Sequence, residues 1–300
     1  MCRKKRRGFS VNVFLPTGDP EGLKVVEKSN WSGRGLVIPR SIFPESRSRS
    51  ELDSSGVYLL FGPSEKSPLP MLYVGEGDPI KPRLNSHYND DNKAFWTHAV
   101  GFTSKDNNLN KAHIQHLESR LVSLAKEAKR CELANGNQPN PPSLSEADEA
   151  TAEAFLDDML LCLPILGYSV FESGTEVVAQ HSTDTADETL YLSGKGIKAK
   201  GKEVSQGFVV FKGSTGVGDD GVVASFAKHV PYDNEARNVL LQQGVLAKEN
   251  DHVIVTEDYV FSSPSQAASV LFGRSSNGRV DWKTDTGKTL RSLQEARVNS

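Results

Sequence analysis

The strongest periodic pattern of apolar residues lies in the middle of the chain. Apolar side chains recur at Ile114, Leu117, Leu121, Leu124 and Ala128, separated alternately by three and four positions. Such steps place side chains on one face of an α-helix. The pattern therefore predicts an amphipathic helix over about 109–129.

A second amphipathic helix is indicated after a turn-rich stretch at 135–142. Ser143-x-x-Glu146 is typical of a capping box, and the predicted helix runs to about Leu163. Short apolar runs bounded by Gly and Pro predict strands elsewhere. The predicted strands are 11–15, 36–38, 57–61, 71–74 and 97–103, with a short helix at 83–89.

From Leu190 onward the pattern alternates short strands, such as 208–212 and 253–256, with short helices. One helix is well marked, because Ser263 can cap it, Pro264 can open it and Gly273 can close it. We therefore expect an α/β (α+β) protein in which a sheet of about three strands is flanked by helices. The expected segments are a basic tail at 1–8, a β-rich lead-in at 9–50, a sheet domain at 51–172, a linker at 173–189 and a separate α+β domain at 190–300.

Composition narrows the classes of partner. The chain has 300 residues, of which 37% are hydrophobic, and this size favours two domains, each with a buried core. A net charge of −3 argues against a basic field over the whole molecule, so any nucleic-acid contact would be local. The longest apolar run, 159–166, is shorter than the roughly 20 residues that a membrane-spanning helix needs. No membrane partner is expected.

The cysteines bear on the cellular compartment. Cys2, Cys131 and Cys162 are odd in number and lack C-x-x-C spacing, so they suggest neither a disulfide framework nor a zinc site. The apolar stretch after the basic start is too short for a secretory signal. A cytoplasmic location is expected.

Two tyrosines lie on neighbouring predicted strands, in Gly56-Val57-Tyr58 and Tyr73-Val74-Gly75. Alone, such tyrosines are ordinary core residues. Arg83 and His87 follow, four positions apart, so on a helix they share one face. The pattern indicates a phosphate-binding guanidinium beside a titratable ring.

Glu118 is the acidic residue that stands out on the 109–129 helix. Its neighbours Ile114, Leu121 and Val122 are apolar, so its carboxylate lies near the core and needs a cation, a donor or a metal. A salt bridge to Arg83 or Lys111 and metal ligation both remain open. On the same helix, His113-x-x-His116 could supply two metal ligands, but a pair of solvated histidines is the more common explanation.

Taken in order and spacing, the tyrosine tripeptides, Arg83, His87 and Glu118 resemble the GIY-YIG nuclease superfamily over about 55–171, with Val in place of Ile in both tripeptides. Residues 262–282 resemble an uncharacterised domain often appended to such nucleases. The resemblance implies a small GIY-YIG-type sheet and a metal-dependent endonuclease that hydrolyses phosphodiester bonds, expected in DNA.

The resemblance also implies roles for the five site residues. Glu118 would hold Mg²⁺ or another divalent cation such as Mn²⁺, and Arg83 would stabilise charge on the phosphoryl oxygens. His87 would assist there or protonate the leaving oxygen. Tyr58 would act as base or water-orienting group, with Tyr73 as its partner.

Some expectations stay open at this point. Glu76 follows Gly75, where several relatives place a basic residue, and Asn135 and Asn137 are candidates for an asparagine that some relatives carry. The C-terminal domain would read or grip DNA, or serve only as a folding or partner module. The alternative for the whole chain is a non-catalytic nucleic-acid or protein interaction module on a decayed GIY-YIG fold.

Overall fold

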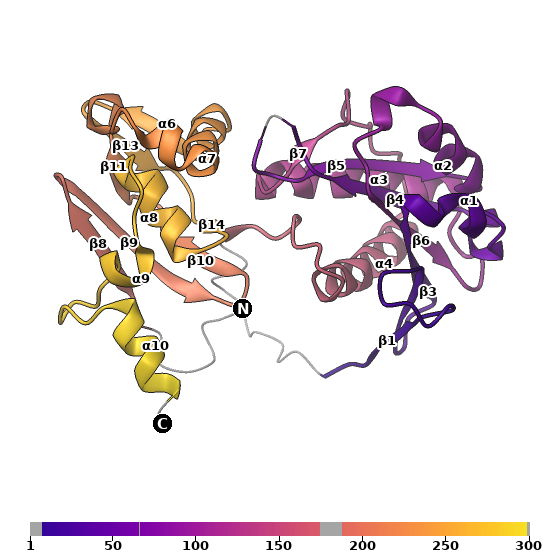
Figure 1. The fold of residues 1–300 in the computed structure, drawn as a ribbon. Helices are drawn as coiled ribbons and strands as arrows, with labels where there is room; N and C mark the ends of the chain where they lie inside the picture. The colour runs from indigo at the N-terminus through magenta and orange to yellow at the C-terminus, as the bar shows by residue number, and fades with distance from the viewer. Residues whose placement is uncertain (1–7, 66, 175–187, 299–300) are drawn as a thin grey trace. The chain divides into compact units, whose positions relative to one another are not determined.

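The chain folds into two compact units that each combine helices with β-sheets, in agreement with the predicted α+β class (Figure 1). The computed structural model describes residues 8–65, 67–174 and 188–298. One unit comprises Met1–Glu65 and Leu69–Phe171, and the other Lys66–Pro68 and Glu172–Ser300. The expected basic tail and linker fall almost entirely on 1–7 and 175–187, outside the described residues.

A seven-stranded sheet forms the centre of the first unit. Its strand order is β1-β2-β3-β6-β4-β5-β7, and neighbouring strands are antiparallel except for the parallel pair β5 and β7. The strands are β1 (Val11–Phe14), β2 (Lys24–Lys28), β3 (Gly33–Pro39), β4 (Gly56–Gly62), β5 (Met71–Gly77), β6 (His98–Ser104) and β7 (Glu132–Leu133).

The sheet is wider than the roughly three strands expected. The strands predicted at its centre are present as β6, β4 and β5. The β-rich lead-in does not form a separate sheet. Strand β3 pairs with β6 from Gly33 opposite Ser104 to Pro39 opposite His98, so β1 to β3 extend the same sheet. An antiparallel strand satisfies the backbone groups that β6 would otherwise expose at its edge.

Helices cover both faces of this sheet, and all seven residues of β4 are buried. Val57, Leu59 and Phe61 pack in the core formed with α3 and α4, whereas Tyr58 and Leu60 face the opposite core. The helices of the first unit are α1 (Phe43–Ser46), α2 (Lys81–Tyr88), α3 (Lys111–Ala128) and α4 (Glu146–Ile165), with 3₁₀ turns η1 (Arg40–Ile42), η2 (Ser50–Asp53) and η3 (Asp91–Lys93).

The predicted helix at 109–129 is confirmed as α3, and its apolar stripe faces the core. The second helix, α4, begins as expected near Glu146, but its N-cap is Ser145 and not Ser143. The Ser145 hydroxyl accepts from the backbone N–H of Asp148 at 3.2 Å. With Ser145 as the N-cap, the Asp148 carboxylate lies in the first turn and accepts a hydrogen bond from the Ser145 hydroxyl. A negative charge in the first turn stabilises the N-terminus of a helix.

The second unit contains two smaller sheets, with strand orders β14-β10-β9-β8 and β11-β13-β12. Its strands are β8 (Leu190–Gly194), β9 (Ile197–Val204), β10 (Gly207–Val210), β11 (Thr215–Val217), β12 (Leu246–Glu249), β13 (His252–Val255) and β14 (Tyr259–Phe261). Its helices are η4 (Asp219–Gly221), α6 (Phe226–His229), α7 (Pro231–Gln242), α8 (Pro264–Phe272), α9 (Gly278–Asp281) and α10 (Leu290–Val298).

Helix α8 confirms the predicted start and stop signals. The Ser263 hydroxyl accepts from the Gln266 N–H, Pro264 opens the helix, and Gly273 ends it in the left-handed region at φ 59°. The apolar side of α8 packs in a core with Phe208 and Trp282. No helix in the described parts of the chain is long and apolar enough to cross a membrane.

Candidate active site

The close approach of two strands explains a glycine of the tyrosine motifs. Strands β4 and β5 pair with Tyr58 opposite Gly75. A Cβ atom at Gly75 would collide with the ring and hydroxyl of Tyr58. The Tyr58 phenol therefore crosses the backbone of β5 only because residue 75 has no side chain.

Tyr58 is fully buried and bonds to a histidine of α2. Its hydroxyl lies 2.8 Å from Nε2 of His87. Burial, aided by the charges of Arg83 and Lys93, lowers the pKa of His87 to about 4, and burial raises the pKa of Tyr58. Both groups are thus neutral at pH 7, and the tautomer of His87 decides which of the two donates in this hydrogen bond.

Tyr73 lies next to this pair. Its ring centroid is 6.3 Å from that of Tyr58 and 5.0 Å from that of His87. The ammonium of Lys93 lies 3.7 Å from the centroid of the Tyr73 ring, within cation–π range. Lys93 could not be predicted as a site residue, because it lies in the 3₁₀ turn η3 without a motif or a periodic pattern.

Arg83 and Glu118 act on both phenols through their charges. Arg83 is exposed on α2, and its guanidinium opposes the rise that burial causes in the pKa of Tyr58 and of Tyr73. The Glu118 charge, from α3, raises the pKa of both phenols, and Arg83 in turn opposes the rise in the pKa of Glu118. The structure thus places all five predicted site residues close enough for their interactions to affect one another's pKa values.

Glu118 does not form the salt bridge that was considered for it. Among the described residues, its half-buried carboxylate has no hydrogen bond or ion pair. Lys111 instead pairs with Glu76, and its ammonium lies 2.6 Å from each carboxylate oxygen. Burial and the nearby Glu76 charge raise the pKa of Glu118 to about 7. A cation beside Glu118 would relieve this unfavourable charge.

The donor set around Glu118 is small and consists of oxygen. The described residues contain no group of three or more His, Cys, Asp or Glu side chains placed to hold one metal ion. Glu118 and Glu76 are the carboxylates whose charges interact here. Two carboxylates suit Mg²⁺ or Mn²⁺, since Mg²⁺ keeps several water ligands and binds few protein groups.

In the described part of the chain, the outer edge of β5 has a partner strand only near its start, and Tyr73 and Gly75 lie beyond that strand. Strand β7 pairs only with Met71 and Leu72. The Asn135 side chain then takes both backbone groups of Val74, accepting from its N–H at 3.0 Å and donating to its C=O at 2.8 Å. Asn135 thus holds the backbone between Tyr73 and Gly75, whereas Asn137 is exposed.

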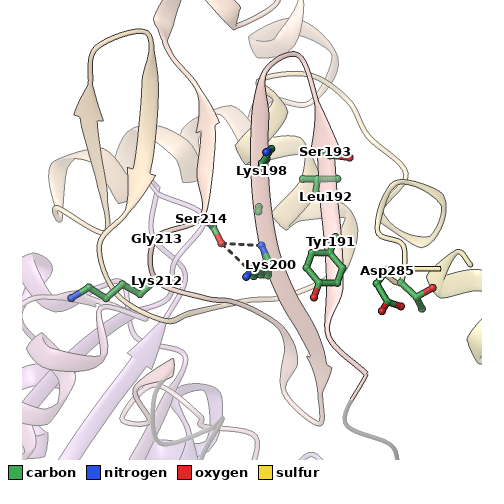
Figure 2. Close-up of a pocket in the computed structure, with 11 residues that line it drawn as sticks. Tyr191, Leu192, Ser193, Lys198, Lys200, Lys212, Gly213, Ser214 and Asp285 are labelled. Carbon is green, nitrogen blue, oxygen red and sulfur yellow. Dashed lines mark hydrogen bonds between the residues drawn. The ribbon is translucent and has the colours of Figure 1, made fainter. Parts of the chain in front are cut away.

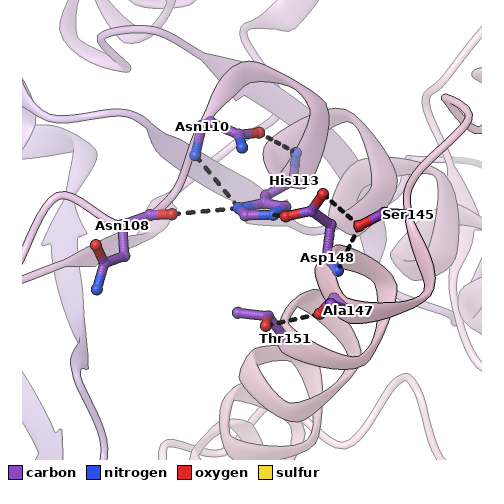
Figure 3. Close-up of polar contacts among 7 residues, drawn as sticks. All are labelled: Asn108, Asn110, His113, Ser145, Ala147, Asp148 and Thr151. Atoms are coloured by element: carbon purple, nitrogen blue, oxygen red, sulfur yellow. Dashed lines mark hydrogen bonds and ion pairs between the residues drawn. The ribbon is translucent and has the colours of Figure 1, made fainter.

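The two histidines of α3 are buried, so the expectation of solvated rings was wrong. Nε2 of His113 lies 3.1 Å from Asp148, and Asn110 and Asn108 contact its other nitrogen (Figure 3). Nε2 of His116 lies 2.7 Å from Glu153. Asp148 and Glu153 both lie on α4, so these histidines join the two helices.

Comparisons with known proteins bear on the second unit. A family model described as "Domain of unknown function (DUF4357)" matches residues 190–294. This match is compatible with the uncharacterised domain expected at the C-terminal side. No curated protein and no solved structure matches the chain. None of these comparisons confirms the GIY-YIG resemblance of the first unit.

Proposed function

We propose that the first unit is a metal-dependent endonuclease of the GIY-YIG type that hydrolyses phosphodiester bonds in DNA. The observation that carries this proposal is the buried hydrogen bond between Tyr58 and His87. It lies beside the exposed Arg83 and the carboxylate of Glu118, which is unpaired among the residues that the structure describes. A cationic fork, a proton acceptor and a potential metal ligand are the groups that phosphoryl transfer requires.

Arg83 is suited to bind the scissile phosphate. It is exposed, and its interactions with Tyr58, Tyr73 and Glu76 raise the pKa of its guanidinium, which remains cationic. Its planar fork can donate two parallel hydrogen bonds to phosphoryl oxygens. We assign it the stabilisation of negative charge that grows on those oxygens.

Tyr58 and His87 would move a proton as a pair. Because burial raises the pKa of Tyr58 above 10.0, ionising the phenol at pH 7 costs more than about 4 kcal/mol without help. Neutral His87 can accept the phenol proton at Nε2, while Arg83 stabilises the phenolate. The lowered pKa of His87 leaves its ring neutral at pH 7, so it does not carry the extra proton that an imidazolium acid would give to the leaving oxygen. The same lowered pKa makes the ring a weak base, so Arg83 and the cation have to stabilise the phenolate for this transfer to occur.

Glu118, with Glu76 beside it, would hold Mg²⁺ or Mn²⁺. The bound cation would act as a Lewis acid that neutralises charge on a phosphoryl oxygen. Lys111 keeps the Glu76 carboxylate fixed on the same side of β5 as α3. The two carboxylates together set where a hard cation is favourable.

The test is cleavage of plasmid, single-stranded DNA and RNA, each with Mg²⁺ or with a chelator. We expect metal-dependent nicking of DNA. Glu118→Ala and Tyr58→Phe should each lower the rate by about 100-fold or more while leaving DNA binding intact. Matched controls are Glu127→Ala, exposed on the same helix, and Tyr168→Phe, which stacks on Phe61 at 4.2 Å.

Wild-type rates in Glu118→Ala would contradict the proposal. A second candidate function is a non-cleaving nucleic-acid or protein interaction module, and the negative Glu76 favours it by opposing phosphate approach near Glu118. Metal-independent DNA binding without nicking of any substrate would support this module instead.

A further inference from the structure

The second unit contains a cavity of about 620 Å³ beside the hairpin β8–β9 (Figure 2). This volume lies within the usual range for a small-molecule or nucleotide site. The lining residues that could recognise a ligand are Tyr191, Ser193, Lys198, Lys200, Lys212 and Asp285.

The alternation along β9 produces the charged wall of this cavity. Ile197 and Ala199 are buried, so Lys198 and Lys200 project from the opposite face. In the pairing of β8 with β9, Tyr191 lies opposite Lys200 and Ser193 opposite Lys198. An aromatic ring, two ammonium groups and a hydroxyl therefore share one exposed face.

Among the described residues that line the cavity, the three lysines outnumber the one carboxylate. Over the described ranges, the ammonium groups of Lys198, Lys200 and Lys212 form no ion pair, and Asp285 is the carboxylate among the lining residues. The Lys200 ammonium lies 5.9 Å from the centroid of the Tyr191 ring. Tyr191 is 38% exposed, which leaves ring surface available for stacking.

The wall is held in place by hydrogen bonds from Ser214 and from Thr215, the first residue of β11. The Ser214 hydroxyl accepts from the backbone N–H of Lys200 at 3.0 Å and donates to its C=O at 3.2 Å. Thr215 does the same for Lys198 at 2.8 and 3.1 Å. These hydrogen bonds hold the backbone of both lysines in place. A ligand therefore binds without the entropic cost of ordering this backbone.

We propose that this cavity binds a segment of single-stranded nucleic acid. Lys198, Lys200 and Lys212 would contact phosphates, and one unpaired base would stack on Tyr191. The exposed ring favours a nucleic acid over an acidic peptide, which has no planar base to stack. The choice of nucleic acid as the ligand rests on the function proposed for the first unit. The charge and the shape of the cavity are observations that do not depend on that function.

The test measures binding of a fluorescent oligothymidylate to the full chain by anisotropy, with chelator present to prevent metal-dependent cleavage. Lys198→Gln combined with Lys200→Gln should weaken binding about tenfold and reduce the slope of log affinity against log salt by about 1.4. The matched control is Lys228→Gln, exposed on α6 of the same unit. It should leave affinity and slope unchanged.

The aromatic contact is tested separately. Tyr191→Ala should weaken binding about fivefold or more, whereas Tyr191→Phe, which keeps the ring, should bind as the wild type does. Circular dichroism should show native structure in every variant. If the double lysine variant fails this check, Lys198→Gln alone takes its place and should reduce the slope by about 0.7. Lys198→Arg with Lys200→Arg retains the charge and should retain affinity.

Three outcomes would overturn the proposal: unchanged affinity in the double lysine variant, equal weakening in Lys228→Gln, or displacement of the oligonucleotide by polyglutamate at equal charge concentration. The last would make an acidic peptide the ligand. If the protein cleaves DNA but the lysine changes have no effect on binding, this site is refuted and the proposed nuclease activity is not. If the lysine changes weaken binding but no substrate is cleaved, only the proposed nuclease activity is refuted.

Discussion

At the scale of single residues, the space above Gly75 is occupied by the Tyr58 phenol. A methyl group there has to displace the ring or the backbone of β5, and overpacking a core typically costs about 1–3 kcal/mol. We expect Gly75→Ala to lose this much unfolding free energy in urea and to lose cleavage. Gly136→Ala, where nothing lies within 4 Å, should change neither property. Equal stability of the two variants would contradict this geometry.

The carboxyl of Glu118 should make stability depend on pH. Its pKa in the folded protein, about 7, lies above its ordinary value of 4.5, so protonation favours the folded state. That contribution is complete below pH 4.5 and is lost as pH rises through 7. At pH 8 without metal, Glu118→Gln should therefore be more stable than the wild type by about 1 kcal/mol, allowing for solvent screening of a half-buried group.

Urea unfolding at pH 4 and pH 8 checks this expectation. The gain from Glu118→Gln should disappear at pH 4, where the wild-type carboxyl is already neutral. Glu127→Gln, exposed on the same helix, should show little difference between the two pH values. A gain of the same size at both pH values would point to packing and not to charge.

The residues of the candidate site could be predicted because their order and spacing form a motif. Their surroundings could not. Lys93 and the ion pair of Glu76 with Lys111 are set by the meeting of segments that are distant in the sequence. Burial, which controls the pKa of Tyr58 and of His87, also depends on those distant segments.

At the scale of elements, α3 and α4 are joined by polar side chains as well as by their apolar faces. The Glu153 carboxylate accepts from Nε of Arg120 at 2.8 Å and lies 2.7 Å from Nε2 of the buried His116. Hydrogen bonds from Arg120 and His116 outweigh the effect of burial and lower the pKa of Glu153. This pairing fixes the two helices in one register.

We expect Glu153→Ala to destabilise the protein by about 1–2 kcal/mol at pH 7, because it leaves a buried nitrogen of His116 without its partner. Glu149→Ala, exposed one turn earlier on α4, should stay within about 0.5 kcal/mol of the wild type. Thermal unfolding followed by circular dichroism measures both variants. Equal melting temperatures would show that the polar pair contributes little.

Local patterns predicted elements better than they predicted connections. The stripe from Ile114 to Ala128 and the caps of α8 gave helices close to those observed. Strand β2 was missed, because Lys24–Lys28 offers only Val25 and Val26 between charged residues. The joining of β3 to β6 could not be predicted, since pairing between distant strands leaves no periodic trace in either one.

At the scale of the whole molecule, the two units have separate cores. Leu117 belongs to a core of the first unit and Phe208 to a core of the second. We expect Leu117→Ala to cost about 2–5 kcal/mol and Phe208→Ala about 3–5 kcal/mol, each in its own unit. Hydrogen exchange with mass spectrometry in moderate urea should show loss of protection in the mutated unit first. Simultaneous loss throughout both units would indicate a single cooperative structure.

The amide of Asn135 imitates a peptide group of a neighbouring strand, and it does so where β7 has already ended. A sheet edge with free backbone groups invites another chain to add a strand. We therefore expect the Asn135 side chain to hinder self-association at this edge. The same two bonds hold Val74 in place between Tyr73 and Gly75, so we expect loss of the Asn135 amide to affect both self-association and the geometry of the candidate site.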